Sequence, residues 1–224
     1  MLLSGLRHGA LAILPLALGA AAYGFAFGVL AGQAGFDALQ VAIMGGIVFA
    51  GSSQIVAVEQ YAAGAGLLGA VLAGAALNLR YVGIVAASAP LVQDWPWHLR
   101  LFALHMATDE NFALTLATRR RDPAVGGAFL LGSGLMLMAA WIAATGAGAV
   151  LGAALPDLER WGLGFAFTAA FIAMAVGLWR GRADAPPWGV AFAVAIALKL
   201  MGLASAWAIV GGAMAGLAIS GLRR

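Results

Sequence analysis

Three short polar stretches interrupt an otherwise apolar chain, and they hold the residues whose chemistry is easiest to interpret. These residues are Ser52, Ser53, Gln54, Asn78, Arg80, His105, Asp109 and Glu110. Hydroxyl and amide groups both donate and accept hydrogen bonds, whereas Arg80 can pair with a carboxylate. Two carboxylates that face one guanidinium leave one acid to be protonated, hydrated or bound to something else. That acid could exchange protons.

The composition places these polar groups in a lipid bilayer. The chain is 63% apolar and 9% charged, and its mean hydropathy is +0.97. Soluble domains are about 45–50% apolar and about 25% charged, and disordered chains are poor in Leu, Ile, Val and Phe. The twelve Lys and Arg residues are nearly balanced by nine Asp and Glu residues. No basic face could therefore follow a phosphate backbone, and no nucleic-acid partner is expected.

Charged residues divide the chain into apolar runs of the length that a spanning helix needs, which is about 20 residues. The predicted spans are 9–31, 39–58, 67–92, 98–118, 124–150, 160–179, 187–202 and 204–222. The runs are continuous rather than alternating, which favours helices over a barrel. The predicted fold is all-α, a polytopic transmembrane helical bundle of about seven or eight spanning segments, some of which could be discontinuous. Residues 1–224 are expected to form a single transmembrane domain.

The fourth of these spans is irregular in composition, because His105, Asp109 and Glu110 lie in its middle. Its crossing is supported by the positive-inside rule. With eight crossings and a cytoplasmic N-terminus, the following cations share the cytoplasmic side: Arg7, Arg119, Arg120, Arg121, Arg180, Arg182, Arg223 and Arg224. We therefore predict an irregular crossing there. The last two spans are short and could form a tight hairpin.

The charged groups lie where a membrane helix should not carry them. Arg80 is near the middle of the third span, and Asp109 and Glu110 are near the middle of the fourth. A charge at the bilayer centre costs about 2.5–3.5 kcal/mol on insertion scales and usually marks a pathway or site. Consecutive spans are antiparallel, so Arg80 can meet a carboxylate at similar depth. The alternative is a structural ion pair that only pins two helices.

Two further features leave alternatives open. His105 precedes Asp109 by one helical turn, which puts both on one face of a continuous helix. It could extend a proton relay, or it could be a hydrogen-bonded structural histidine. Ser52 and Ser53 follow Gly51 in the second span, which favours either a broken helix or an intact one whose serines bond the preceding turn. Broken helices at the midplane commonly form carrier sites.

Small residues recur at four-residue intervals, at Gly24, Gly28 and Gly32; Gly148 and Gly152; and Gly212 and Gly216. Such spacing lets helix backbones approach closely in lipid, although an Ala- and Gly-rich chain also produces it by chance.

The sequence contains no complete enzyme or metal-binding motif among those considered. A P-loop needs Gly-Lys-Ser or Gly-Lys-Thr, but Lys199 stands between two leucines. The three histidines are scattered, and cysteine is absent. In Gly132-Ser133-Gly134 a leucine replaces the first glycine of an intramembrane serine-protease motif. We expect neither an enzyme nor a bound metal or cofactor.

Three motifs in a fixed order resemble those of a known family. They are Phe49-Ala50-Gly51-Ser52-Ser53-Gln54, Leu77-Asn78-Leu79-Arg80 and Thr108-Asp109-Glu110-Asn111-Phe112. With them, the chain resembles the AzlC family of bacterial branched-chain amino acid export permeases. The resemblance implies a multi-pass large subunit in the bacterial inner membrane, working with a small hydrophobic subunit of the AzlD type. The pair would export valine, leucine, isoleucine or related amino acids. Tyr81 stands where the family tends to have histidine, which leaves open whether a family histidine role applies here and which substrate is exported.

Two hypotheses follow. In the first, a proton-coupled exporter, Ser52, Ser53, Gln54 and Asn78 bind the substrate's backbone groups. Arg80 attracts its carboxylate or pairs with Asp109, and Asp109 or Glu110 couples proton movement, with His105 as a possible extension of the relay. In the second, the chain is a non-transporting membrane scaffold subunit whose buried charges only fix assembly.

Overall fold

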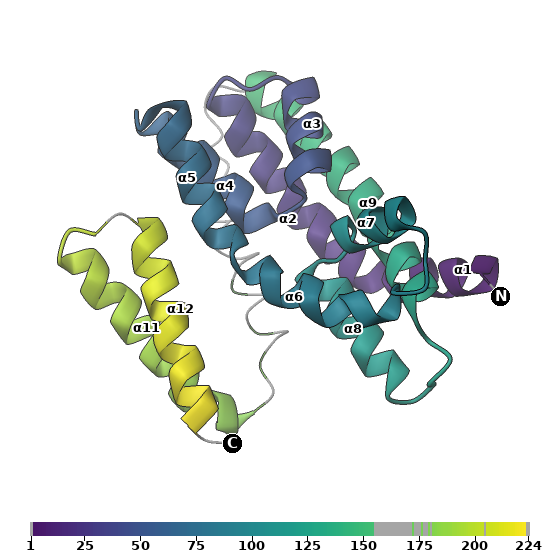
Figure 1. Cartoon of the computed structure of the whole chain (residues 1–224). Coiled ribbons are helices and arrows are strands. Elements are labelled where there is room, and N and C mark those ends of the chain that lie inside the picture. The colour runs from purple at the N-terminus through teal and green to yellow at the C-terminus, as the bar shows by residue number, and fades with distance from the viewer. Residues whose placement is uncertain are drawn as a thin grey trace.

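The computed structural model describes residues 2–154, 172, 176, 179, 181–203 and 205–222. The α-helices there are α1 (Leu2–Ala12), α2 (Leu14–Gln33), α3 (Ala38–Val48), α4 (Gly51–Ala62), α5 (Gly66–Asn78), α6 (Arg80–Ser88), α7 (Trp97–His105), α8 (Asp109–Arg119), α9 (Gly127–Ala154), α11 (Ala185–Leu200) and α12 (Ser205–Leu222). Short 3-10 turns occupy Ala89–Leu91 (η1) and Arg182–Asp184 (η3). These residues contain no strand, so the all-α prediction is confirmed for them (Figure 1).

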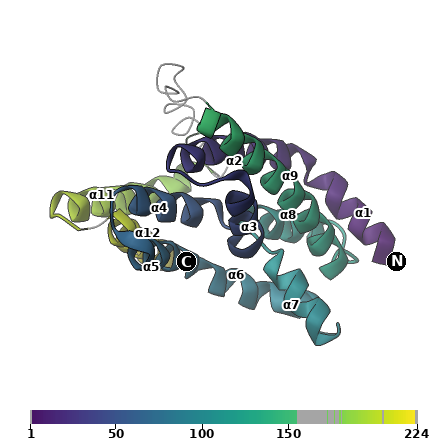
Figure 2. The ribbon, with the colours of Figure 1, turned by 90° about the horizontal axis from the view of Figure 1, so that it is seen from above.

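Helix α9 is the long uninterrupted element against which the N-terminal helices pack. It runs beside both α1 and α2, and α3 packs on it as well (Figures 1 and 2). Glycines bring the backbones together, since a Cβ on Gly28 would collide with the carbonyl of Thr145, and one on Gly148 with that of Phe25. The close helix contact predicted from glycine spacing is therefore confirmed between α2 and α9.

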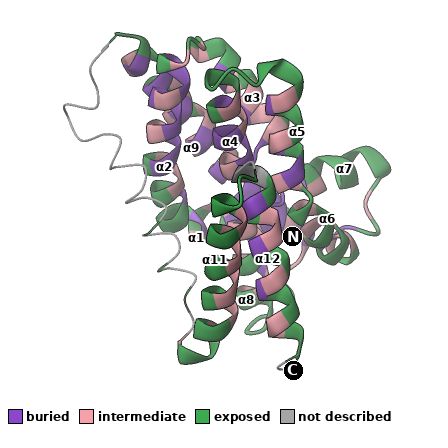
Figure 3. Ribbon diagram, turned by 90° about the vertical axis from the view of Figure 1, so that its left-hand side faces the viewer, coloured by how far each residue is buried: buried purple, intermediate pink, exposed green. Residues whose placement is uncertain are grey.

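Buried residues concentrate where α2, α4 and α9 face one another, while the outer faces carry large exposed apolar side chains (Figure 3). Leu18 is 73% exposed, and Phe192 is 70% exposed. Apolar groups on this scale are unfavourable in water and favourable in lipid.

Three described helices are long and apolar enough to cross a membrane: Leu14–Gln33, Gly127–Ala154 and Arg182–Leu200. A fourth span results if the bent pair Gly66–Asn78 and Arg80–Leu91 counts as one. These helices correspond to the predicted spans 9–31, 124–150, 187–202 and 67–92. The predicted span 160–179 lies outside the described residues, apart from residues 172, 176 and 179. The total of seven or eight spans is thus not confirmed and stays a prediction.

The first predicted span, 9–31, has its boundary wrong, because the chain forms α1 and α2 with a junction at Ile13. Pro15 lies in the first turn of α2 and has no N–H for the carbonyl four residues earlier, so the helix is interrupted there. At the other end of the chain, α11 and α12 form the predicted hairpin. Gly202 has a φ of +88° in their connection, a conformation that glycine adopts without strain.

Three consecutive predicted spans are each broken near their middle. The span 39–58 is divided between α3 and α4 at Phe49 and Ala50, and 67–92 bends by 46° between α5 and α6. The span 98–118 is divided between α7 and α8. Helices α7 and α8 have 9 and 11 residues, too few for the roughly 20 that a crossing needs. The predicted span 67–92 is therefore present as a bent pair of helices, and the irregular fourth segment consists of two short helices.

Candidate functional site

The first turns of three helices meet through Arg80, the first residue of α6. Its Nη2 donates a hydrogen bond to Ser52 Oγ of α4 at 2.8 Å. Its Nη1 lies 3.0 Å from Asp109 Oδ2 at the start of α8. One guanidinium therefore joins all three broken spans. The expected meeting of Arg80 with a carboxylate is confirmed, and the carboxylate is that of Asp109.

A second hydrogen bond ties the first break to the second. Ser53 Oγ donates to Asn78 Oδ1 at 2.6 Å. Ser53 is 1% exposed, so its hydroxyl is satisfied by this bond within the protein. The bond fixes the start of α4 against the end of α5, immediately before the bend at Leu79.

The backbone at the first break is strained, and the N-terminus of the helix that follows has no side-chain cap. Phe49 has φ 41° and ψ 45°, a left-handed conformation that is uncommon for a bulky residue and costs about 1–3 kcal/mol. Helix α4 then begins at Gly51 without a side-chain cap. Its first N–H groups carry the positive end of the helix dipole, which favours anions. Arg80 adds a full positive charge beside this end.

The third break is built by a capping box that sequence reasoning left unused. Thr108 and Asn111 cap each other's backbone N–H groups at the start of α8. Asn111 is fully buried, and its Nδ2 also donates to the carbonyls of Met106 and Leu130. The Thr-x-x-Asn spacing was a readable signal, because a threonine three residues before a side chain that can accept marks a helix start. This cap places Asp109 and Glu110 in the first turn, where carboxylates suit the helix dipole.

Gln54 and Trp141 form a buried pair behind the break. Trp141 Nε1 on α9 donates to Gln54 Oε1 at 3.1 Å, and Gln54 is fully buried. The indole ring also touches Gly51, so it lies directly against the first residue of α4. Gln54 does not line the cavity described below, and its role in binding substrate stays a prediction. Trp141 lies 87 residues from Gln54, and no local pattern signals that contact.

His105 and Glu110 take positions that the sequence did not predict. His105 Nε2 lies 2.8 Å from the carbonyl oxygen of Gly46 at the end of α3, and it must be the donor because a carbonyl only accepts. The expectation that His105 and Asp109 share one helix face is wrong, since α7 ends at His105 and α8 starts at Asp109. Glu110 is half-buried, and its carboxylate has no hydrogen bond or ion pair with any residue in the described part of the chain.

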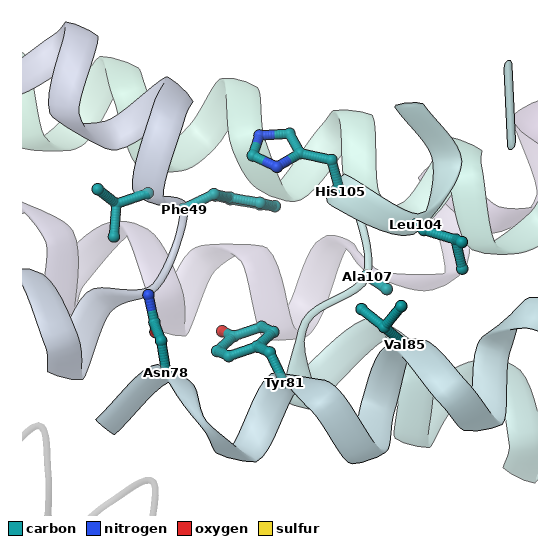
Figure 4. A pocket seen from close by; sticks show the side chains of 8 residues that line it. Phe49, Asn78, Tyr81, Val85, Leu104, His105 and Ala107 are labelled. Atoms are coloured by element: carbon teal, nitrogen blue, oxygen red, sulfur yellow. The ribbon is translucent and has the colours of Figure 1, made fainter. Parts of the chain in front are cut away.

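A cavity of about 170 Å³ opens beside these breaks. It is lined by Val48, Phe49, Asn78, Tyr81, Val85, Leu104, His105 and Ala107 (Figure 4). The strained Phe49 and the hydrogen-bonded Asn78 and His105 thus all border it. Arg80 lies over the Tyr81 ring, with its Cζ 5.2 Å from the ring centroid. The cavity and the Arg80 ion pair therefore share a wall. Apart from Asn78 and His105, its lining was not among the predicted site residues.

Replacing Trp141 by phenylalanine is expected to destabilise the protein by about 1–3 kcal/mol, because the buried Gln54 carbonyl loses its donor. Adding Gln54→Leu should recover much of that loss, since removing both polar partners is close to neutral. Thermal unfolding of the detergent-solubilised chain measures both changes. A double variant no more stable than Trp141→Phe alone would contradict this account.

Comparison with known proteins gives two matches. The family model described as AzlC protein matches residues 15–155, the stretch that contains all three breaks. An uncharacterized membrane protein of Archaeoglobus fulgidus is 31% identical over 223 residues, which cover 96% of this chain and 94% of that protein. No solved structure matches the chain.

Proposed function

Because this chain belongs to the AzlC family of membrane proteins, we propose that it is a secondary transporter that exports branched-chain or other small apolar amino acids. We further propose that export is coupled to protons. In this proposal the chain is the large subunit of a two-component permease in the bacterial inner membrane, with a small AzlD-like partner. The observation that carries the proposal is the convergence of three broken helices on Arg80 beside a small cavity.

The carboxylate of an amino acid is proposed to bind between Arg80 and the start of α4. A guanidinium presents paired N–H groups that match a carboxylate, and the uncapped N-terminus of α4 adds backbone donors. Ser52 is already held there by Arg80. Asn78, which borders both this region and the cavity, is proposed to bind the substrate's amino group with its carbonyl oxygen.

The proton-coupling role is proposed for Glu110 together with Asp109. Arg80 pairs with Asp109, so its charge is committed to that carboxylate. Glu110 has no such bond among the residues the structure describes and can take up or release a proton without first breaking one. A substrate carboxylate that binds Arg80 displaces Asp109 from its ion pair, and Asp109 can then also take up a proton. Substrate binding and proton movement are thereby linked through one guanidinium. The bond between His105 and Gly46 favours a structural role for His105 over a place in this relay.

Export of valine derived from a dipeptide tests the proposal. Cells that lack other exporters of branched-chain amino acids accumulate valine when they hydrolyse a valine dipeptide. Expression of the full chain, with its small partner subunit, is expected to lower internal valine several-fold and to raise external valine. Internal valine equal to that of cells with an empty vector would overturn the proposed function.

The scaffold alternative keeps one supporting observation, the direct ion pair between Arg80 and Asp109. A purely structural pair predicts that Arg80→Ala impairs folding or association with the partner subunit instead of selectively stopping flux. The double substitution Arg80→Ala with Asp109→Ala distinguishes the transporter from the scaffold.

A further inference from the structure

The cavity has two chemically different ends, and this difference carries an inference that rests on the proposed function. Val85, Leu104 and Ala107 gather at one end, and Asn78 and the Tyr81 hydroxyl lie at the other (Figure 4). The first end offers only aliphatic carbon, whereas the second offers hydrogen-bonding groups. A ligand with one polar and one apolar part would therefore lie along the cavity in one direction.

The polar end borders the start of α4 and the ring over which Arg80 lies. Asn78 accepts a hydrogen bond from Ser53, and Arg80 lies over the ring of Tyr81. A substrate whose carboxylate binds at Arg80 and α4 thus has its α-carbon near Asn78 and Tyr81. Its side chain can then extend between the rings of Phe49 and Tyr81, which face the space from opposite sides (Figure 4).

We propose that the cavity is the subsite for the substrate's side chain, and that Val85 on α6 and Leu104 on α7 set the upper limit of its size. An apolar cavity of about 150 Å³ takes up benzene, so a space of about 170 Å³ holds a branched side chain of three or four carbons. Val85 and Leu104 come from two different helices, α6 and α7, which are joined through η1. The width of the aliphatic end therefore depends on tertiary packing.

Replacing Val85 by phenylalanine tests this assignment in the assay above, with alanine, valine, leucine and phenylalanine supplied as dipeptides. The larger ring should fill the aliphatic end, so leucine export should fall at least tenfold relative to alanine export, as expected when a pocket loses room for a few carbons. Val82→Phe is the matched control, because Val82 lies on the same helix, is 68% exposed and does not line the cavity. It should leave the ratio of leucine to alanine export unchanged.

A second variant guards against misfolding of Val85→Phe. Val85→Ala enlarges the same end and is expected to raise phenylalanine export about tenfold relative to leucine export. An unchanged substrate ratio in the folded Val85 variants, with transport retained, would overturn the subsite alone. If the unmodified chain exports none of the four amino acids, the proposed function fails and this inference fails with it. Detergent-extracted yield and monodispersity show which variants are folded.

Discussion

Replacing Arg80 by alanine is expected to lower amino acid export by about 100-fold while the protein still folds. The guanidinium bonds Ser52 and Asp109 and, in the proposed function, also holds the substrate carboxylate. Each hydrogen bond to a charged group is worth about 1.5–3 kcal/mol, and a loss of about 3 kcal/mol corresponds to roughly two orders of magnitude in rate. The dipeptide assay measures export. Arg80→Lys should recover only part of it, because an ammonium keeps the charge without the paired geometry.

The double substitution Arg80→Ala with Asp109→Ala distinguishes a transport role from a structural one. If the pair only pins helices, removing both charges leaves no unpaired group, and the double variant should regain the function that the single variant loses. If Arg80 binds the substrate, the double variant should fold at least as well as Arg80→Ala and remain inactive. Recovery of export in the double variant would therefore refute the carboxylate-binding role.

Replacing Glu110 by glutamine is expected to abolish the stimulation of transport by a pH gradient while exchange continues. Arg80 is committed to Asp109, and the adjacent acid, Glu110, has no ion-pair partner among the described residues. A difference of one pH unit is worth about 1.4 kcal/mol per proton, which is about tenfold in accumulation ratio. In everted vesicles with an acidic interior, the variant should lose this tenfold accumulation of labelled leucine. Exchange of labelled for unlabelled leucine without a gradient should stay within about twofold of its original rate, a difference of less than 0.5 kcal/mol.

Glu59→Gln is the matched control for this acid-to-amide change. Glu59 lies near the end of α4 at an exposed position, and neither the hydrogen bond nor the ion pair of Arg80 involves it. It should retain full stimulation by the gradient. A Glu110→Gln variant that accumulates leucine as strongly as the unmodified chain would show that coupling does not pass through Glu110. A variant that loses exchange as well would assign Glu110 to substrate binding.

The sequence located the polar groups at all three breaks, because each is a local anomaly in an apolar run. It predicted an irregular helix only in the fourth span, left a break at Ser52 open and gave no sign of the bend beside Arg80. The sequence singled out Arg80, Ser53 and the residues that their side chains bond at these breaks. Arg80 bonds Ser52 and Asp109, and Ser53 bonds Asn78. The glycine contacts between α2 and α9 were also readable, since their spacing is a property of single helices. The position of His105 could not be predicted in this way. Its expected place one turn before Asp109 assumed a continuous helix, but α7 ends at His105 and α8 begins at Asp109.

What the sequence alone determined is the membrane environment, the helical class, the family and the identity of the polar groups, because each depends on composition or on short-range spacing. The tertiary structure alone decided that Arg80 pairs with Asp109 rather than Glu110, that Trp141 holds Gln54, and that Phe49, Val85 and Leu104 border one cavity. The physical reason is that helix periodicity relates side chains only while a helix continues. Each break reorients the following helix, so the groups that meet across three breaks are fixed by the packing between helices and, at α8, by the capping box.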